Sequence, residues 1–396
     1  MIQKNRSEIL LAGSLILALL LFYLLIVKGK WREVEGQWER LNLKTYTTQV
    51  ELKADESVLT ASLSGRNEKL QHADSILRKR ITGCGAIVKE SRISAEGGSI
   101  FYTIDNVINN AALFQLLSTK GKLEFFHTFE ASEVLSLLSY ADQKLVTILA
   151  ETNTAIKQQN KAKQEISAGD ALFGDLIPDS LKKKAMLAQE ADRLQSPLFS
   201  LLYLNTIGTG NNITIGEGPI AGRSFGKDTA TINRYLSHPE IQSLFPDDLQ
   251  LMWSASALNQ EKDVYALYAI RHSKQLKDAP INNQYIINAE TLIDKDRVAE
   301  VDLQMNSGGA TIFERMTREA SSPKTTKRCI AIVLDGKVYS APRVMETILN
   351  GKIRITGVDN VIEAGNLTNM ILSGELEFPF RARGISVSEK RGYRLQ

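Results

Sequence analysis

The sequence has few of the residues that build metal, redox or nucleophilic sites. Its two cysteines, Cys84 and Cys329, lie far apart and form no C-x-x-C spacing, so neither a zinc motif nor a redox motif is present. A disulfide between them in an oxidising compartment is one alternative, and two free thiols are the other. The four histidines show neither an i,i+4 pair nor an H-E-x-x-H motif; they are His72, His127, His238 and His272. The sequence therefore predicts no bound metal and no cofactor.

The chain also lacks a strong charge of either sign. Its 396 residues include 48 Lys and Arg against 45 Asp and Glu, which gives a formal net charge of only +3. Domains that bind nucleic acid carry a clustered basic excess, so this balance predicts no nucleic-acid partner. The apolar and charged fractions, 43% and 23%, are those of a globular protein, and the length allows two or three domains.

One long apolar run is present, from Ile9 to Val27, and it contains no charged residue. At about 1.5 Å per residue, a helix of this length spans roughly 28 Å, which is close to the hydrocarbon thickness of a bilayer. The run continues into Lys28 and Lys30 without a small-x-small cleavage site, so it predicts an uncleaved transmembrane helix. Its only ionisable side chain is Tyr23, which offers no carrier for a proton path.

The clearest local pattern is the stretch CIAIVLDGKVYSAP, residues 329–342. An apolar run meets Asp335-Gly336 and a second short apolar-alternating run follows, which is typical of two antiparallel strands joined by a two-residue turn. Asp-Gly is favoured in such a turn because both positions need positive φ.

This stretch and its flanks resemble the large periplasmic domain of SecD, an auxiliary subunit of the bacterial Sec protein translocase. Residues 301–317 (VDLQMNSGGATIFERMT) look like the preceding strand and helix, and residues 363–379 (EAGNLTNMILSGELEFP) look like the following helix and exit strand. Residues 74–88 and 121–126 are similar to the opening helix and strand of that family. The residues for which the resemblance implies structural roles are Asp335, Gly336, Tyr339, Ser340, Ala341, Pro342 and Gly374.

A repeated order of elements indicates the fold class. Strand, helix and strand are predicted at 99–104, 109–117 and 122–128, and the same order returns at 299–305, 309–316 and the strand that begins at Cys329. If this is a duplication rather than a coincidence, two αβ halves share one sheet, as in a ferredoxin-like base. The expected fold class is therefore α+β, with one N-terminal transmembrane helix and an inserted αβ head domain.

The expected boundaries follow composition and the resemblance. They are 1–8 for a cytoplasmic tail, 9–27 for the transmembrane helix, 28–66 for a juxtamembrane stalk, 67–165 and 279–380 for the two halves of the base, 166–278 for the inserted head and 381–396 for a basic tail. Residues 130–165 are expected to form a long amphipathic helix. The links near Glu165 and Asp278 are polar and lack an apolar seam, which predicts movement of the head relative to the base.

The head contains two kinds of candidate site. Aromatic residues that could line a groove for unfolded polypeptide are Phe199, Tyr203, Phe225 and Trp253. Residues 222–226, GRSFG, match G-x-S-x-G, and Asp263 and His272 follow in the order of a hydrolase triad. No strong apolar strand leads into Gly222, so a glycine-shaped loop with a solvent-facing Ser224 is the simpler interpretation. The neighbouring glycine-rich stretch, 216–222, misses the dinucleotide-binding spacing.

The resulting hypothesis is a non-enzymatic, SecD-like component of Sec-dependent export that binds translocating polypeptide and has no proton channel of its own. The resemblance implies a single-pass protein of the bacterial inner membrane with its bulk in the periplasm. The expected partners are a SecY-type channel, a SecD/SecF-type motor, unfolded secretory polypeptide and membrane lipid. The family's Asp-Leu-x-Gly-Gly run is missing after the first helix, so a non-export periplasmic scaffold or interaction module that retains the SecD fold is one alternative. A serine hydrolase that uses Ser224 is the second.

Overall fold

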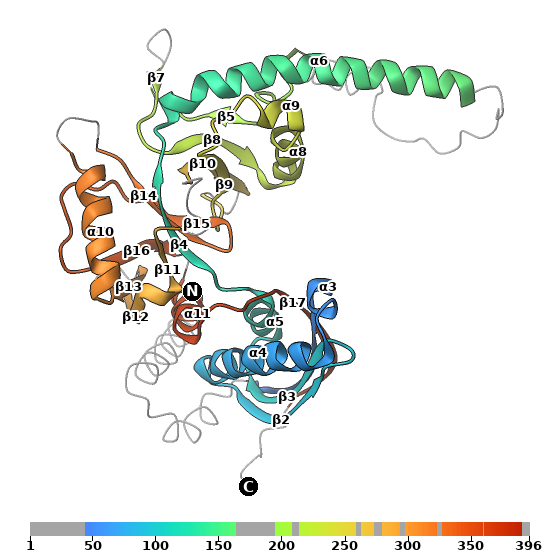
Figure 1. Ribbon diagram of the computed structural model, residues 1–396, viewed down its shortest axis with the longest axis vertical. Coiled ribbons are helices and arrows are strands. Elements are labelled where there is room, and N and C mark those ends of the chain that lie inside the picture. The colour runs from blue at the N-terminus through green and yellow to red at the C-terminus, as the bar shows by residue number, and fades with distance from the viewer. Residues whose placement is uncertain are drawn as a thin grey trace, which may run out of the picture.

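The computed structural model describes residues 44–163, 195–207, 214–258, 263–272, 279–293, 298–322, 327–358 and 360–389. These residues form a mixture of helices and sheets, which confirms the α+β prediction. Three units follow one another along the longest axis of the molecule (Figure 1). We call them the ferredoxin-like unit, the central unit and the distal unit.

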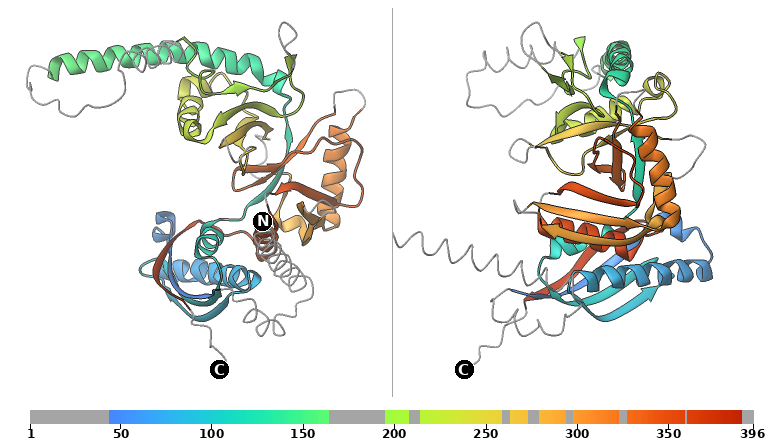
Figure 2. Two further views of the ribbon diagram at one scale, coloured as in Figure 1. Left: turned by 180° about the vertical axis from the view of Figure 1, so that it is seen from behind. Right: turned by 90° about the vertical axis from the view of Figure 1, so that its left-hand side faces the viewer.

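The ferredoxin-like unit is a four-stranded antiparallel sheet with two helices on one face (Figures 1 and 2). Its elements are β1 (Tyr46–Ala54), α3 (Glu56–Leu59), α4 (Leu63–Gly83), β2 (Ile87–Ser94), β3 (Ser99–Val107), α5 (Asn110–Ser118) and β17 (Phe380–Glu389). The strand order is β17-β1-β3-β2. Apart from the short α3, the connectivity is the βαββαβ of ferredoxin-like folds, with the last strand supplied from far along the chain.

Alternation of apolar and polar residues explains why this sheet has one covered face. Val50 and Leu52 on β1 are fully buried, whereas Gln49 and Lys53, which flank this pair, are exposed. The buried residues pack with Leu70, Ala73, Leu77 and Ile81, which recur at helical spacing along α4. The opposite face of the sheet consists mainly of polar side chains.

The sequence predicts β3 of this sheet, at 99–104, but not the strands β1 and β17. Residues 46–66 were expected to belong to a stalk, but they include the central strand β1, because alternating Val50, Leu52 and Ala54 enter the core. Residues 381–389 were expected to be a basic tail, but they form most of β17, whose backbone pairs with β1. The two strand-helix-strand repeats do not share one sheet, because β3 and the strand at 299–305 lie in different sheets.

The central unit contains a three-stranded antiparallel sheet in the order β12-β13-β16. Its elements are β11 (Ile281–Asn282), the 3-10 helix η3 (Asn283–Tyr285), β12 (Ile286–Ile293), β13 (Ala299–Met305), α10 (Ser307–Ala320), β16 (Lys352–Val358) and α11 (Val361–Ser373). Burial alternates strictly along β13, and its buried residues form one core with α10 and α11. On the other face, the Arg354 guanidinium forms ion pairs with Asp302 and Glu300.

The predicted hairpin is present as β14 (Ile330–Leu334) and β15 (Lys337–Ser340). Asp335 and Gly336 have φ of 50° and 75°, so both turn positions adopt the positive φ that the Asp-Gly pair predicts. All five residues of β14 are buried because this strand lies between β15 and β4 (Leu123–Thr128). The hairpin prediction is confirmed.

The distal unit is built on α6 (Ala131–Lys163), which projects beyond the sheet at its far end (Figures 1 and 2). The remaining elements are β5 (Tyr203–Leu204), β6 (Thr206–Ile207), β7 (Thr214–Ile215), β8 (Ile220–Phe225), α8 (Gly226–Leu236), α9 (Pro239–Gln242), β9 (Leu249–Trp253) and β10 (Val264–Arg271). Val134, Leu138, Ala141 and Leu145 form a buried stripe at helical spacing on α6. The predicted long helix is therefore confirmed in its position.

The central and distal units share one eight-stranded sheet, in which six strands follow the order β15-β14-β4-β10-β8-β5, β11 pairs with β4 and β9 pairs with β10. Strands β4 and β10 pair at only two positions, but a buried apolar cluster lies across the joint. Its members are Phe126, Met252, Ile270, Ala279, Ala331, Val333 and Val338. This cluster argues against the free movement that polar links near Glu165 and Asp278 predict. Both link positions lie outside the described residues.

Two further expectations concern covalent bonding and the membrane. Cys84 and Cys329 are free, so the disulfide alternative is wrong for this structure. Among the described residues, no helix is both long and apolar enough to cross a membrane. The predicted span, 9–27, lies outside the described residues.

Candidate polypeptide-binding edge

Two of the four predicted aromatic residues meet at the edge of the eight-stranded sheet. Tyr203 lies on β5, the last strand of the sheet, and Phe225 ends the neighbouring strand β8. Their ring centroids are 6.0 Å apart, with the planes at 86°, which is an edge-to-face contact. Tyr203 is 53% exposed and Phe225 is 37% exposed, so the pair presents apolar surface to solvent.

A glycine allows β5 to approach β8 closely enough to form this pair. Leu204 pairs with Gly222, and Tyr203 pairs with Arg223. A Cβ at Gly222 would lie 2.8 Å from the side chain of Leu202 and 3.0 Å from the carbonyl oxygen of Tyr203. Any larger residue would therefore push β5 away from the sheet. The glycine of the G-x-S-x-G pattern has a packing role.

Cationic and polar groups surround the aromatic pair. The Lys227 ammonium lies 5.7 Å from the centroid of the Phe225 ring, within the range of a cation–π interaction. An Nη atom of Arg223 donates a hydrogen bond of 2.6 Å to the side-chain carbonyl of Asn205. The edge therefore combines exposed rings, positive charge and a short terminal strand.

The other two aromatic candidates lie in the core instead. Phe199 and Trp253 are half-buried and pack against the cluster under α6. The Trp253 indole N–H donates a hydrogen bond of 2.7 Å to Asn233 Oδ1. The backbone at 198–199 is fixed by Asp142, whose Oδ1 accepts hydrogen bonds from Leu198 and Phe199. The structure therefore brings together Tyr203 and Phe225 and leaves Phe199 and Trp253 apart from them.

Ser224 does not have the geometry of a hydrolase nucleophile. Its side chain is fully buried within β8, and its hydroxyl donates a hydrogen bond of 2.8 Å to the carbonyl oxygen of Leu201. A nucleophile elbow exposes its serine on a sharp turn, whereas this serine lies in a strand. The hydrolase alternative is therefore wrong, and so is the expectation of a solvent-facing loop serine. Of the two supposed triad partners, Asp263 pairs its carbonyl with the Gly226 amide, and His272 stacks on Phe126.

An exposed apolar residue next to this edge was missed from the sequence. Ile207 is 61% exposed and lies on β6, which follows β5 after a single residue, Asn205. β5 and β6 have two residues each, which is too short for a periodicity argument, so no local pattern identifies Ile207.

The structure also shows a junction that the sequence did not reveal. Arg80 on α4 is fully buried, and its guanidinium donates to four carbonyl oxygens. One belongs to Leu116 (3.0 Å) in the last turn of α5, two belong to Thr119 and Lys120 (2.8 Å) in the α5–β4 connection, and the fourth belongs to Gly374 (2.9 Å) after α11. Burial lowers the pKa of Arg80 to about 10, while the charge of Asp335 opposes this shift. The side chain therefore stays charged at neutral pH.

Several of the residues singled out by resemblance lie at or near this junction. The Asp335 carboxylate accepts hydrogen bonds from the amides of Gly121 (2.9 Å) and Lys122 (2.7 Å), which fixes the hairpin against β4. Gly374 has φ of 101°, which favours glycine at the end of α11. Of the other five, Gly336 is in the hairpin turn, and Tyr339 and Ser340 lie on β15. After the hairpin, Ala341 packs on the joint cluster, and the Pro342 carbonyl accepts a hydrogen bond from the Ile330 amide.

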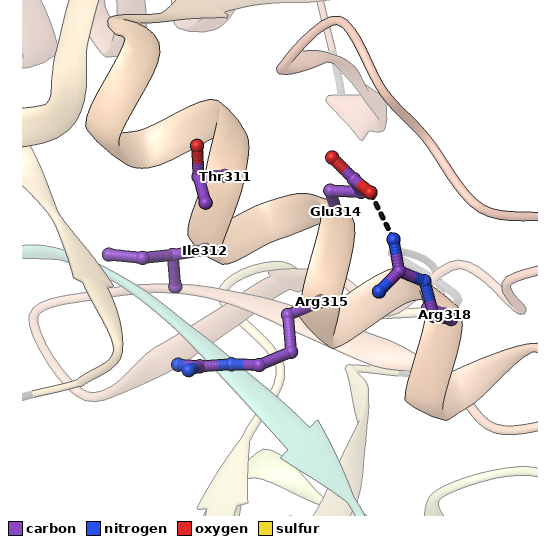
Figure 3. Close-up of a pocket in the computed structure, with 5 residues that line it drawn as sticks. All are labelled: Thr311, Ile312, Glu314, Arg315 and Arg318. Atoms are coloured by element: carbon purple, nitrogen blue, oxygen red, sulfur yellow. Dashed lines mark hydrogen bonds and ion pairs between the residues drawn. The ribbon is translucent and has the colours of Figure 1, made fainter.

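A shallow surface hollow lies on α10 (Figure 3). It is lined by Thr311, Ile312, Glu314, Arg315 and Arg318. Glu314 and Arg318 form an ion pair one turn apart, and the Arg315 side chain extends away from them (Figure 3). Its lining contains none of the residues predicted to bind polypeptide. Within the described ranges, no group of three or more His, Cys, Asp or Glu residues is placed to hold a metal ion.

Comparisons with known proteins point to one family. The family model described as "SecDF, P1 head subdomain" matches residues 265–378. That range lies mostly within residues predicted to be the second half of the base. The SecD translocase subunit of Rhodothermus marinus is 28% identical over 316 residues, covering 79% of this chain and 45% of the relative. The SecD subunit of Syntrophobacter fumaroxidans is 40% identical over 102 residues, covering 26% of this chain and 18% of the relative.

Among solved structures, one titled "Structure and function of a membrane component SecDF that enhances protein export" is 18% identical, with a TM-score of 0.40. It covers 85% of this chain and 99% of that one. This chain spans less than half the length of the Rhodothermus relative. These curated relatives are named as translocase subunits and not as enzymes, which agrees with the prediction of a non-enzymatic protein. Over residues 265–378 the chain is similar to the P1 head subdomain of SecDF, and over most of its length it is similar to a SecD translocase subunit.

Proposed function

We propose that this chain assists Sec-dependent protein export by holding an extended segment of the translocating polypeptide at the β5–β8 edge. The observation that carries the proposal is the exposed Tyr203–Phe225 pair on the terminal strands of the sheet. An extended chain can add to a sheet edge through backbone hydrogen bonds, while shallow apolar contacts accept many side chains. Such binding requires no catalytic residue, and it suits clients of varied sequence.

The proposal places the protein in the bacterial inner membrane, anchored once by residues 9–27, with its bulk in the periplasm. The names of its relatives support a role in protein export. A SecY-type channel and a SecD/SecF-type motor are the proposed partners. Because the apolar run contains no ionisable side chain other than Tyr23, we assign proton movement to the partner.

Binding of an unfolded secretory precursor to the purified full chain tests the proposal. The double variant Tyr203→Ala and Phe225→Ala should weaken binding about tenfold, or about 1.4 kcal/mol, because it removes both exposed rings. The matched control is Tyr140→Ala on α6, since Tyr140 is 61% exposed and lies outside the edge. Equal affinity of the double variant and the unmutated chain, with unchanged thermal midpoints, would contradict the proposal. Absence of both precursor binding and co-purification with translocase subunits would favour the non-export scaffold alternative.

A further inference from the structure

The uncovered face of the ferredoxin-like sheet carries a cluster of cations at one end. Cross-strand pairing places Lys53 opposite Arg381, and Glu51 opposite Arg383. Glu51 is also opposite Phe101, which in turn pairs with Arg92. These residues alternate with the buried Val50 and Leu52, so they lie on the face away from α4 and α5. Lys53, Arg92, Arg381 and Arg383 are all exposed.

The arrangement of these cations is electrostatically unfavourable without a partner. Like charges directly opposite one another destabilise an antiparallel pair, and Lys53 faces Arg381 in this way. Within the described part of the chain, neither residue forms an ion pair with a carboxylate. Arg381 does act electrostatically on Asp55, but the Asp55 carboxylate already accepts from the Ser57 amide to cap α3. An external anion would relieve the repulsion.

Neighbouring side chains already contact two carboxylates on this face, those of Glu51 and Asp105. Glu51 accepts a hydrogen bond of 2.9 Å from the Ser99 hydroxyl. Asp105, on the same face, is buried between Thr47 and Lys89. Arg92 lies over the Phe101 ring, 4.4 Å from its centroid, which gives the centre of the face a flat group with apolar and cationic character. On β2, Glu90 pairs with Thr103, and its carboxylate is the one that remains exposed on this strand.

The position of the face identifies the anionic partner. The sheet lies at one end of the longest axis, with its helices turned toward the rest of the molecule (Figures 1 and 2). The chain enters this unit from the apolar run at 9–27, and β17 is followed in sequence by Lys390, Arg391 and Arg394. We propose that the uncovered face of the ferredoxin-like sheet docks on the anionic lipid headgroups of the membrane. This inference rests on the membrane location proposed above.

Fluorescence quenching on the full chain in vesicles tests this docking. A fluorophore is attached at Ser386→Cys on the uncovered face, with Cys84 and Cys329 replaced by alanine, and the quencher is carried on lipid headgroups. Quenching is expected in vesicles in which about a third of the lipid is phosphatidylglycerol, but not in pure phosphatidylcholine, and salt should abolish it. A label at Gln250→Cys, in the distal unit, should stay unquenched in both.

Charge variants locate the contact. Replacing Lys53, Arg381 and Arg383 together by glutamate should abolish quenching at residue 386. The matched triple variant on exposed cations elsewhere (Lys79, Lys337 and Lys352 to glutamate) should retain it. If the first triple variant does not fold, the loss of quenching when salt is added to the unmutated chain tests the same electrostatic contact. Quenching that is absent from both kinds of vesicle, or equal in both, would overturn the docking proposal. Shielding of the fluorophore at residue 386 by a second copy of this chain, with no lipid present, would overturn it as well.

The proposal that residues 9–27 anchor the chain in the membrane can fail while the docking proposal stands. A chain that an alkaline wash removes from the vesicles would refute the membrane anchor. If residue 386 were still quenched on anionic vesicles before the wash, the docking proposal would stand.

Discussion

At the residue scale, the buried Arg80 has the greatest structural consequence. Its four acceptor carbonyls lie in the last turn of α5 and on the two chain segments that link the ferredoxin-like unit to the central unit, one after α5 and one after α11. The same connections are joined by a hydrogen bond from the Leu376 amide to the Lys120 carbonyl, 2.9 Å, and by an ion pair between Lys120 and Glu375. Arg80 therefore ties the ferredoxin-like unit to the central unit.

Replacing Arg80 by methionine should destabilise the protein by roughly 3–5 kcal/mol, because it leaves buried carbonyl oxygens without donors. Thermal unfolding of the full chain followed by circular dichroism measures this loss. Lys79→Met, at the exposed neighbouring position, is the control and should change the midpoint little. An Arg80→Met variant that melts with the unmutated protein would show that the carbonyls find other partners.

A second residue-scale prediction concerns acid stability at the joint with α6. Both carboxylate oxygens of Glu133 accept hydrogen bonds from the Arg328 guanidinium, at 2.8 and 2.9 Å, which lowers the pKa of Glu133 to about 2. A carboxyl whose pKa is lower in the folded state stabilises the protein above its unfolded pKa of about 4.5. This contribution is lost as the pH falls from about 4.5 toward 2.

Glu133→Gln should therefore lower the thermal midpoint at neutral pH, and the difference from the unmutated protein should shrink between pH 4.5 and pH 2. A melting series across this range measures it. Glu290→Gln, on an exposed strand position, is the matched control and should give a small, pH-independent difference. A Glu133→Gln difference that stays constant across the range would contradict the assigned cause.

At the element scale, the sequence predicts helices and strands well but assigns some of them to the wrong neighbours. The hairpin at 330–340 and the helices α5, α6 and α10 follow from turn chemistry and apolar periodicity, which are local signals. The pairing of β1 with β17 joins residues more than 300 positions apart, and no local signal specifies it. Exposed polar residues on β17, such as Arg381 and Arg383, made this strand resemble a tail.

The role of β17 can be tested by truncation. A chain ending at Pro379 loses Phe380 from the core and leaves one edge of β1 unpaired, so the ferredoxin-like unit should unfold or aggregate. A chain ending at Glu389 keeps all four strands and should melt like the full protein. Near-ultraviolet circular dichroism and size-exclusion chromatography distinguish the two. Normal folding of the shorter chain would show that β17 is dispensable.

The sequence also predicts the candidate site only in part. The local sequence does not indicate which of the four aromatic candidates are exposed, and only tertiary packing separates the exposed pair, Tyr203 and Phe225, from the half-buried Phe199 and Trp253. Ser224 illustrates the same limit. The G-x-S-x-G spacing is visible in the sequence, but burial of its hydroxyl against the Leu201 carbonyl is not.

At the scale of the whole molecule, the two proposed surfaces lie in the end units of an elongated protein. The uncovered sheet face lies at one end, and the β5–β8 edge lies in the distal unit beyond the central unit (Figure 1). The Arg80 junction and the apolar joint cluster connect the three units. If the first surface rests on the membrane, the second is held away from it, where it can meet polypeptide that leaves a channel.

Site-specific photocrosslinking in membrane vesicles that contain the full chain and a stalled secretory precursor tests the central claim most directly. A photoreactive phenylalanine analogue replaces Tyr203 in one variant and Tyr140, an exposed tyrosine on α6, in the other. We expect crosslinks to the precursor from position 203 and none from position 140. Crosslinks from position 140 with none from position 203 would contradict binding at the β5–β8 edge.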